Sequence, residues 1–369
     1  MADRALNAVN DPRGLSRTKQ RDTSLKENTM NRSIALRMLG IAGAFVALAH
    51  MLGVARAADD KIYVMKITLP TLNDPTYQFA KDYAAAVEMH SGGRIKTELY
   101  PASQLGSIPR QIEGTQFGAI QCAVLPPEFF VGVDGRFEVM AAPGLVDSME
   151  HGQRLAADPE VVKLILGLGA DKGLRGVGLM MASPSSLITR TPVRHLTDLK
   201  GKKIRALASQ FQTASLERLG ANPVALTLGD VLPALQQGAI DGALSALKNF
   251  VAMHFGDTSK YVTEIGQPAI FGVVEISKKW YDSLPSDLQQ IVDRDAAARS
   301  VAVNPQAIDI VNGARKDWVD NGGELINLPP DEQASMLKTL SSVGADVSKA
   351  KPQLSAAYQV VTEAAQRTR

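Results

Sequence analysis

The chain has 369 residues, of which 45% are hydrophobic and 21% charged, and its formal net charge is +2. This composition excludes fibrous and disordered chains. The length is sufficient for two domains that each bury a hydrophobic core.

The N-terminal part of the chain has the pattern of an export signal. Arg32 and Arg37 precede an apolar stretch over residues 38–54, and the small residue Ala57 closes the segment. The apolar run is shorter than the roughly 20 residues that a membrane-spanning helix needs. We predict a secretory signal peptide that is cleaved after Ala57. Residues 1–29 are then an upstream extension with no part in the fold.

Removal of residues 1–57 changes the charge balance. It takes away nine of the 40 basic and four of the 38 acidic residues, which leaves 31 basic and 34 acidic. A slightly acidic product lacks the electrostatic footprint of a nucleic-acid-binding protein. Cys122 is the single cysteine, so no intrachain disulfide can form. An exported two-domain chain without disulfides favours a bacterial periplasm over an animal secretory fluid.

Strand and helix signals alternate after the leader. A β-rich run over 61–71 is followed by a helix that begins after Asp74 and ends at Gly92, and residues 94–101 alternate as a second strand. Alternating strands and helices predict an α/β fold with mainly parallel sheets.

One unit of this pattern occurs twice. The sequence Gly-Ala-Ile at residues 118–120 recurs at 238–240, and in both places a short helix ends at the glycine and leads into a small-residue strand. We therefore predict two βαβαβ lobes, as in periplasmic binding proteins. The expected boundaries are residues 58–182 and 271–310 for lobe I, and residues 183–270 and 311–369 for lobe II.

Arg205 lies near the end of the predicted strand 203–208. In an open α/β sheet the ligand crevice lies beyond the carboxyl ends of the strands. We therefore expect Arg205 to face a cleft between the lobes.

The C-terminal third is predicted to be helical. Residues 283–323 begin with a Ser-Pro-Ser-Asp cap cluster, end at two glycines and contain Pro305, which should kink the helix. A helix of this length can span both lobes and bend as they close. Further helices are expected over 328–340 and 351–366.

Signatures of catalysis are absent from the sequence. The histidines after residue 57 are His90, His151, His195 and His254, and none forms a His-x-x-x-His pair. Neither a Gly-x-Ser-x-Gly elbow nor a Walker-type phosphate loop occurs. We therefore predict neither metal nor cofactor, and a two-lobed exported chain with a cleft favours ligand capture over catalysis.

Five motifs resemble one family in their order and spacing. The extracytoplasmic solute receptors of TRAP transporters, of the DctP-like type, are similar to this chain over nearly all of residues 60–330. The motifs are YPASQLGS from Tyr100, LKGKKIRA from Leu199, LGANPV from Leu219, ALQQGAIDGA from Ala234 and YDSLPSDLQQIV from Tyr281.

The resemblance implies a periplasmic receptor, expected to be monomeric, that closes around an organic acid. It delivers this acid to a small and a large membrane permease subunit. In the family the arginine of the LKGxKIR motif pairs with the ligand carboxylate, and Arg205 occupies that position. A guanidinium offers two parallel donors to a carboxylate, which a lysine cannot do.

The chain departs from the family pattern at two positions. Ser245 stands where many relatives place an asparagine that touches the ligand, and Ser185 stands where some relatives carry a second arginine. With Gln210 and Asn73 these serines are the expected secondary contacts. Fewer charged and amide partners predict fewer polar groups on the ligand.

The expected wall of the pocket is apolar, because Pro126, Ala208 and Leu228 occupy the other positions around it. This wall indicates a monocarboxylate with a hydrophobic or aromatic body. Three alternatives stay open. They are a C4-dicarboxylate receptor of the same family, an exported α/β enzyme that acts on an organic acid, and a receptor of another uptake system.

Overall fold

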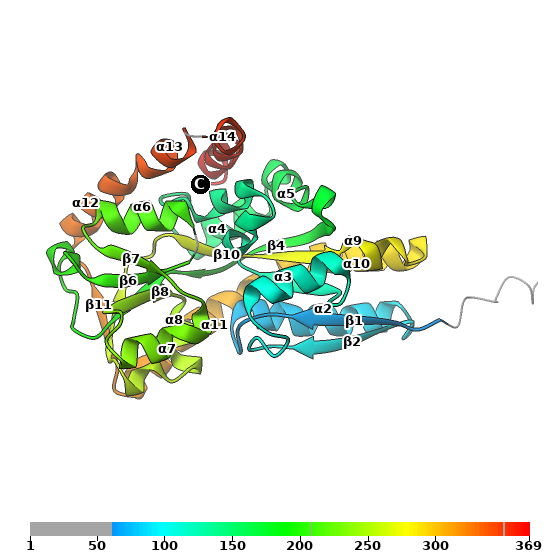
Figure 1. Ribbon diagram of the computed structural model, residues 1–369, viewed down its shortest axis with the longest axis horizontal. Coiled ribbons are helices and arrows are strands. Elements are labelled where there is room, and N and C mark those ends of the chain that lie inside the picture. The colour runs from blue at the N-terminus through cyan, green and yellow to red at the C-terminus, as the bar shows by residue number, and fades with distance from the viewer. Residues whose placement is uncertain (1–60, 208, 350) are drawn as a thin grey trace, which may run out of the picture. The chain divides into compact units, whose positions relative to one another are not determined.

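Two β-sheets, each covered by helices on both faces, form the folded part of the chain (Figure 1). The computed structural model describes residues 61–207, 209–349 and 351–369. The predicted signal peptide and Ala208 lie outside the described residues.

The first sheet has the strand order β2-β1-β3-β10-β4. β1 runs parallel to β2 and β3, whereas β10 is antiparallel to β3 and β4. Its strands are β1 (Tyr63–Thr68), β2 (Ile95–Tyr100), β3 (Cys122–Leu125), β4 (Leu174–Pro184) and β10 (Ala269–Ser277).

The second sheet has the strand order β11-β9-β5-β8-β6-β7. β6 runs parallel to β7 and β8, β9 runs parallel to β11, and β5 is antiparallel to both β8 and β9. Its strands are β5 (Ser186–Thr189), β6 (Lys203–Ala206), β7 (Asn222–Ala225), β8 (Gly242–Ser245), β9 (Tyr261–Glu264) and β11 (Glu324–Asn327).

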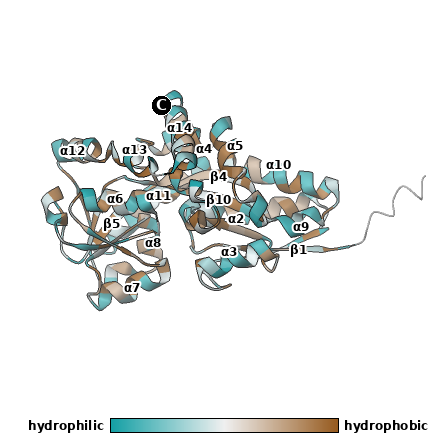
Figure 2. Ribbon diagram, turned by 45° about the horizontal axis from the view of Figure 1, so that its top comes forward, coloured by the Kyte–Doolittle hydropathy of each residue, from teal (hydrophilic) through white to brown (hydrophobic). Residues whose placement is uncertain are grey.

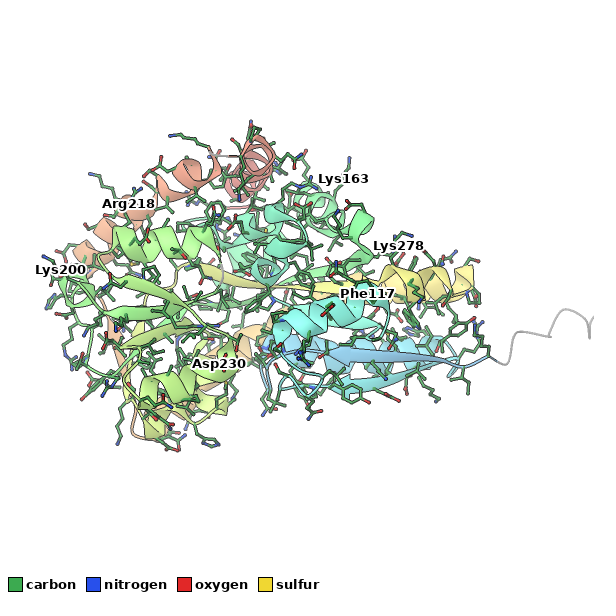
Figure 3. The ribbon with its side chains drawn as sticks, viewed as in Figure 1. Phe117, Lys163, Lys200, Arg218, Asp230 and Lys278 are labelled. Atoms are coloured by element: carbon green, nitrogen blue, oxygen red, sulfur yellow. The ribbon has the colours of Figure 1, made fainter. Side chains whose placement is uncertain are left out.

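Helices cover both sheets, and hydrophilic residues follow the outward faces of helices such as α12 (Figure 2). Exposed cations, among them Lys163 and Arg218, point to solvent (Figure 3). The helices are α2 (Pro75–His90), α3 (Ile108–Phe117), α4 (Met149–Ala156), α5 (Pro159–Leu166), α6 (Gln210–Arg218), α7 (Leu228–Gln236), α8 (Leu247–Ala252), α9 (Lys278–Asp282), α10 (Ser286–Ala302), α11 (Asn304–Asp320), α12 (Pro330–Leu340), α13 (Val343–Ser348) and α14 (Pro352–Arg367).

Each sheet separates two hydrophobic clusters because successive side chains of a strand point to opposite faces. In β3, Cys122 and Val124 belong to one cluster, and Ala123 and Leu125 belong to the other. β5 divides in the same way between the two clusters of the second sheet. Central strands such as β3, β5 and β8 are therefore buried on both faces, as the predicted α/β class requires.

The repeated unit has the predicted form in both sheets. α3 is followed by Gly118 at φ 86° and leads into β3, and α7 is followed by Gly238 at φ 71° and leads into β8. A positive φ is available to glycine at little cost, which explains why glycine follows both helices. The two-lobed α/β fold predicted from this repeat is confirmed.

Both sheets are mixed, which the alternation of strands and helices did not indicate. The chain leaves the first sheet at the end of β4, passes through Ser185 and enters the second sheet as β5. It returns between β9 and β10, through residues 265–268. A strand that crosses directly into the neighbouring sheet, without a helical return, can run antiparallel to its neighbours.

The long helix is divided at Val303 into α10 and α11. Pro305 lies in the first turn of α11, where its missing N–H costs no helical hydrogen bond. The predicted kink therefore falls two residues before the proline. α10 packs against α2 and β4, and α11 packs against α8 and β11, so the pair spans both sheets.

α14 packs on elements of the first sheet, although the predicted lobe II includes residues 311–369. Figure 1 shows α14 beside α4 and α5, and Leu354, Val361 and Ala364 share a cluster with Val161 of α5. The lobe boundaries stay a prediction.

Gly242 in the AIDGA motif should tolerate no side chain. An added Cβ would lie 2.5 Å from the carbonyl oxygen of Ile188 and 2.6 Å from Cγ2 of Thr189. We expect Gly242→Ala to lower the free energy of unfolding by about 1–3 kcal/mol, measured by urea denaturation. The control is Gly313→Ala in α11, where a Cβ meets nothing within 4 Å and a gain of about 1 kcal/mol is expected. Equal stability of the two variants would contradict this account of β8.

Candidate functional site

A cavity lies where the carboxyl ends of strands from both sheets meet. Residues after β1 and β3 form one side of it, and residues of β6 and β8 form the other. Its volume is about 50 Å³. The lining residues are Pro70, Thr71, Ile108, Pro126, Phe129, Ser185, Arg205, Leu207, Gln212, Leu228, Leu244, Ser245, Asn249 and Ile270.

A second cavity, of about 400 Å³, adjoins the first. The two share five lining residues: Pro70, Thr71, Ile108, Leu228 and Asn249. The second cavity extends past Ser107 and Thr227 to Met253. Arg205 is the only charged residue among the described residues that line either cavity. Together they form a mostly apolar space with one cation.

The guanidinium of Arg205 is held in place by two backbone carbonyls. Its Nε donates to the carbonyl oxygen of Leu226 at 2.9 Å, and its Nη1 donates to that of Leu244 at 2.8 Å. Nη2 is buried and has no hydrogen-bond partner among the described residues. Two donors therefore fix the orientation of the group, and the remaining N–H bonds of the guanidinium are available to a ligand.

Arg205 is 1% exposed. Burial lowers its pKa to about 10, and the nearby Glu128 opposes part of that change. A group with this pKa is charged at neutral pH. A buried and incompletely paired cation attracts an anion strongly, because water screens little of the interaction.

Both predicted serines line the cavity, and both hydroxyls have protein partners. Ser245, 8% exposed, accepts a hydrogen bond from Nδ2 of Asn249 at 3.1 Å. Ser185 donates to the carbonyl oxygen of Pro268 at 2.5 Å, and its own carbonyl accepts from the amide of Gly266. Ser185 thus ties together the two segments that cross between the sheets.

Gln210 and Asn73 do not line either cavity. The side chain of Gln210 is exposed, and its amide N–H donates to Oε2 of Glu138 at 2.9 Å. Asn73 is exposed with φ 57°, directly before the N-cap Asp74 of α2. Each occupies the turn that starts a helix. The structure therefore gives both residues a role in the local backbone and none in the cavity.

Sequence reasoning missed Gln212 and Asn249. Oε1 of Gln212 accepts a hydrogen bond from the amide of Leu207, which shapes the turn after β6. Asn249 lies in α8, which follows directly after β8, and its amide contacts the hydroxyl of Ser245 at 3.1 Å. The signal available was the position of Asn249 just after the carboxyl end of the predicted strand, where the ligand crevice of an α/β sheet lies. The expected wall residues Pro126 and Leu228 do line the cavity.

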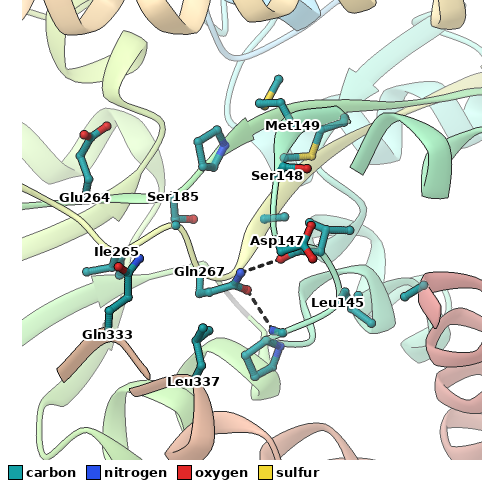
Figure 4. Close-up of a pocket in the computed structure, with 18 of the residues that line it drawn as sticks. Leu145, Asp147, Ser148, Met149, Ser185, Glu264, Ile265, Gln267, Gln333 and Leu337 are labelled. Carbon is teal, nitrogen blue, oxygen red and sulfur yellow. Dashed lines mark hydrogen bonds between the residues drawn. The ribbon is translucent and has the colours of Figure 1, made fainter. Parts of the chain in front are cut away.

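A larger cavity, of about 650 Å³, lies elsewhere (Figure 4). Gln267 stands in it, accepts from the amide of Gly144 at 2.9 Å and donates to the carbonyl of Val146 at 2.8 Å. Glu264 is paired with Arg315 at 2.6 Å. Among the described residues that line it, no buried polar side-chain atom lacks a partner. Its size exceeds that of the Arg205 cavity, but the buried polar side-chain atoms that line it already have partners.

Two further observations concern the described part of the chain. No cluster of three or more His, Cys, Asp or Glu side chains in it could hold a metal ion. No helix in it has the length and apolar character needed to cross a bilayer.

Comparison with known proteins places the chain in one family. Residues 68–350 match the family model described as bacterial extracellular solute-binding protein, family 7. The C4-dicarboxylate-binding periplasmic protein DctP of Rhodobacter capsulatus is 26% identical over 83% of this chain and 92% of its own length. The uncharacterized protein YiiZ of Salmonella typhimurium is 28% identical over 56% of this chain and 64% of its own length, which is less than two thirds of that relative.

A solved structure shows the same fold. A TRAP periplasmic solute binding protein of Desulfovibrio salexigens, with bound orotic acid, superposes with a TM-score of 0.78 at 22% identity. The superposition covers 83% of this chain and 100% of that one. The matched family consists of ligand-binding receptors, which confirms the prediction that the chain is not an enzyme. The chain therefore belongs to the bacterial extracellular solute-binding proteins of family 7, the DctP-type solute receptors of TRAP transporters.

Proposed function

We propose that this receptor captures an organic acid through one carboxylate, which Arg205 anchors in the cavity between the two sheets. The observation that carries the proposal is the geometry of Arg205. Two of its nitrogens are fixed on backbone carbonyls, and Nη2 is buried without a partner. A carboxylate that bridges Nη1 and Nη2 would complete the hydrogen bonds of the group.

The body of this acid is hydrophobic or aromatic. Phe129, Leu228 and Leu244 surround the space beside Arg205, and the adjoining 400 Å³ cavity has room for a ring or a branched chain. A second carboxylate, as in the C4-dicarboxylates named for the Rhodobacter capsulatus relative, would find no second cation among the described lining residues. Burying it there would be costly.

Closure of two lobes over the ligand is part of this proposal. The sequence predicts residues 58–182 and 271–310 as lobe I and residues 183–270 and 311–369 as lobe II; because α14 packs on elements of the first sheet, we assign α14 to lobe I. The chain crosses between the sheets at Ser185, at 265–268, at Val303 and again between α13 and α14, and few crossing points allow a hinge motion. The loaded receptor, a monomer exported by its signal peptide to the periplasm, delivers the acid to the small and large TRAP permease subunits.

Thermal unfolding in the presence of candidate ligands tests the function. The panel comprises aromatic and aliphatic monocarboxylates, C4-dicarboxylates, sugar acids, amino acids and neutral sugars. A ligand at a hundredfold its Kd adds about 2.7 kcal/mol to the free energy of unfolding, which shifts Tm by several degrees in a protein of this size. We expect acids with one carboxylate and an apolar body to give the largest shifts. Stabilisation by neutral sugars alone would refute the anchor.

A further inference from the structure

Glu128 is a buried acid that does not itself line the cavity but lies in the chain between two residues that do. It lies in the 3₁₀ segment Pro127–Gly132, between the lining residues Pro126 and Phe129. The residue is 1% exposed, and neither of its carboxylate oxygens accepts a hydrogen bond from another described residue. A buried carboxylate without donors is unfavourable by itself, so this group needs a proton or a donor from outside the fold.

Arg205 and Glu138 are the charged groups that act on Glu128. Burial raises the pKa of Glu128 to about 7; its own backbone amide opposes the rise, Glu138 adds to it, and Arg205 opposes it. Glu138 itself accepts from the amide of Gln210, and its nearby cation is Lys351. Glu128 and Arg205 thus interact electrostatically but form no ion pair, and each has buried polar atoms without a partner.

We propose that Glu128 is a second polar anchor for the ligand, accepting a hydrogen bond from an ammonium or hydroxyl group next to the carboxylate that Arg205 holds. This rests on the proposed function of the same cavity. The ligand carboxylate would accept from Nη2 of Arg205, and Glu128 is the described acid whose charge acts on that guanidinium. A donor on the adjacent ligand carbon is therefore placed to satisfy it.

Charge balance in the cavity is the physical reason why an ammonium or hydroxyl group should raise the affinity of an acid. When a plain monocarboxylate pairs with Arg205, an ionised Glu128 beside it is an uncompensated buried anion, so the complex must also take up a proton. An α-amino acid brings one cation and one anion, which pair both protein groups and leave no net charge. An α-hydroxy acid supplies a donor without a charge. Hydrogen bonds to charged groups are the strong ones, so the substituent should contribute markedly to affinity.

The test compares acids that differ only at the carbon next to the carboxylate. One series is hydrocinnamate, phenyllactate and phenylalanine, and the other is isocaproate, α-hydroxyisocaproate and leucine. Titration calorimetry on the full-length receptor should give at least about tenfold tighter binding for a substituted acid than for its unsubstituted parent. Between about pH 6 and 8, ionisation of Glu128 should strengthen binding of the amino acid and weaken binding of the unsubstituted acid.

Two variants of Glu128 and one control test whether Glu128 causes the preference for substituted acids. Glu128→Met should abolish the preference for either substituent, and Glu128→Gln should abolish the preference for ammonium while it retains part of the preference for hydroxyl. Glu138→Gln keeps an acceptor for the amide of Gln210 and removes a charge that raises the pKa of Glu128, so it should retain the preference and shift its pH dependence to lower pH. Unfolding curves check that each variant folds, and Glu128→Gln alone suffices if the methionine variant does not.

The outcomes separate this inference from the proposed function. Binding that depends on Arg205 but shows no preference for a substituent, or a preference that survives both Glu128 variants, overturns the role of Glu128 and leaves the receptor function intact. Acid binding that does not depend on Arg205 overturns the carboxylate anchor itself. If none of the six acids binds, the inference is wrong in its choice of ligand class.

Discussion

Arg205→Ala should weaken binding of the stabilising acid by roughly 30-fold to several thousand-fold, because truncation of one partner of a buried charged pair costs about 2–5 kcal/mol. The loss has two parts. The ligand carboxylate loses its donors, and it remains in an apolar cavity that offers no other cation among the described lining residues. Titration calorimetry of the purified receptor measures this effect directly.

A second variant separates charge from geometry. Arg205→Lys keeps a positive charge, but one ammonium cannot hold the carbonyls of Leu226 and Leu244 and also present two donors to a carboxylate. We therefore expect an affinity between those of the wild type and Arg205→Ala. The control is Arg218→Ala, which removes an exposed arginine paired with Asp346. An Arg205→Ala receptor that binds its acid as the wild type does would refute the anchor.

Glu275→Met should stabilise the receptor by about 1–3 kcal/mol at neutral pH, which corresponds to several degrees in Tm. Glu275 lies in the central part of β10, is 0% exposed, and has no hydrogen-bond partner for either oxygen among the described residues. In the sheet it stands beside Ala123 and Gly176. Methionine has a similar volume and buries no polar atom, so it removes the cost and leaves no large cavity.

The gain from Glu275→Met should depend on pH. Burial raises the pKa of Glu275 well above its ordinary value, so the folded protein holds a proton that the unfolded chain releases above a pKa of about 4.3. The contribution of this group to stability is therefore present below that pKa and is lost as pH rises toward the folded pKa. Removing the group should help little near about pH 4 and most near about pH 8.

Urea denaturation at several pH values measures this dependence. The control is Glu217→Met on the exposed side of α6, for which a change within about 0.5 kcal/mol is expected. A Glu275→Met receptor that is less stable than the wild type at about pH 8 would show that the carboxyl group of Glu275 has a favourable partner in the folded state.

The sequence by itself predicted the two-lobed α/β class and singled out Arg205 as the candidate anchor. The Gly-Ala-Ile repeat predicted two similar lobes because a helix that turns into a strand at glycine is a local event, governed by the φ angles that glycine allows. The LKGKKIRA motif identified Arg205, and the rule for carboxyl ends of strands predicted that it faces a cleft. Pro305 predicted a kink within the long helix, which α10 and α11 show at Val303.

The tertiary structure alone decided which polar residues meet. Gln210 and Asn73 were plausible contacts by position along the chain, yet each lies in a turn outside the cavity. Gln212, Asn249 and Glu128 reach the neighbourhood of Arg205 because α6, α8 and the segment after β3 converge there.

That convergence depends on pairings between strands far apart in the chain, such as β3 with β10 and β5 with β8. It also depends on the two segments that cross between the sheets. Local propensity carries no information about such long-range pairing, which is selected by the burial of all four hydrophobic clusters together. The sequence could therefore predict an organic acid as the ligand, while the folded chain determined which side chains surround the cavity.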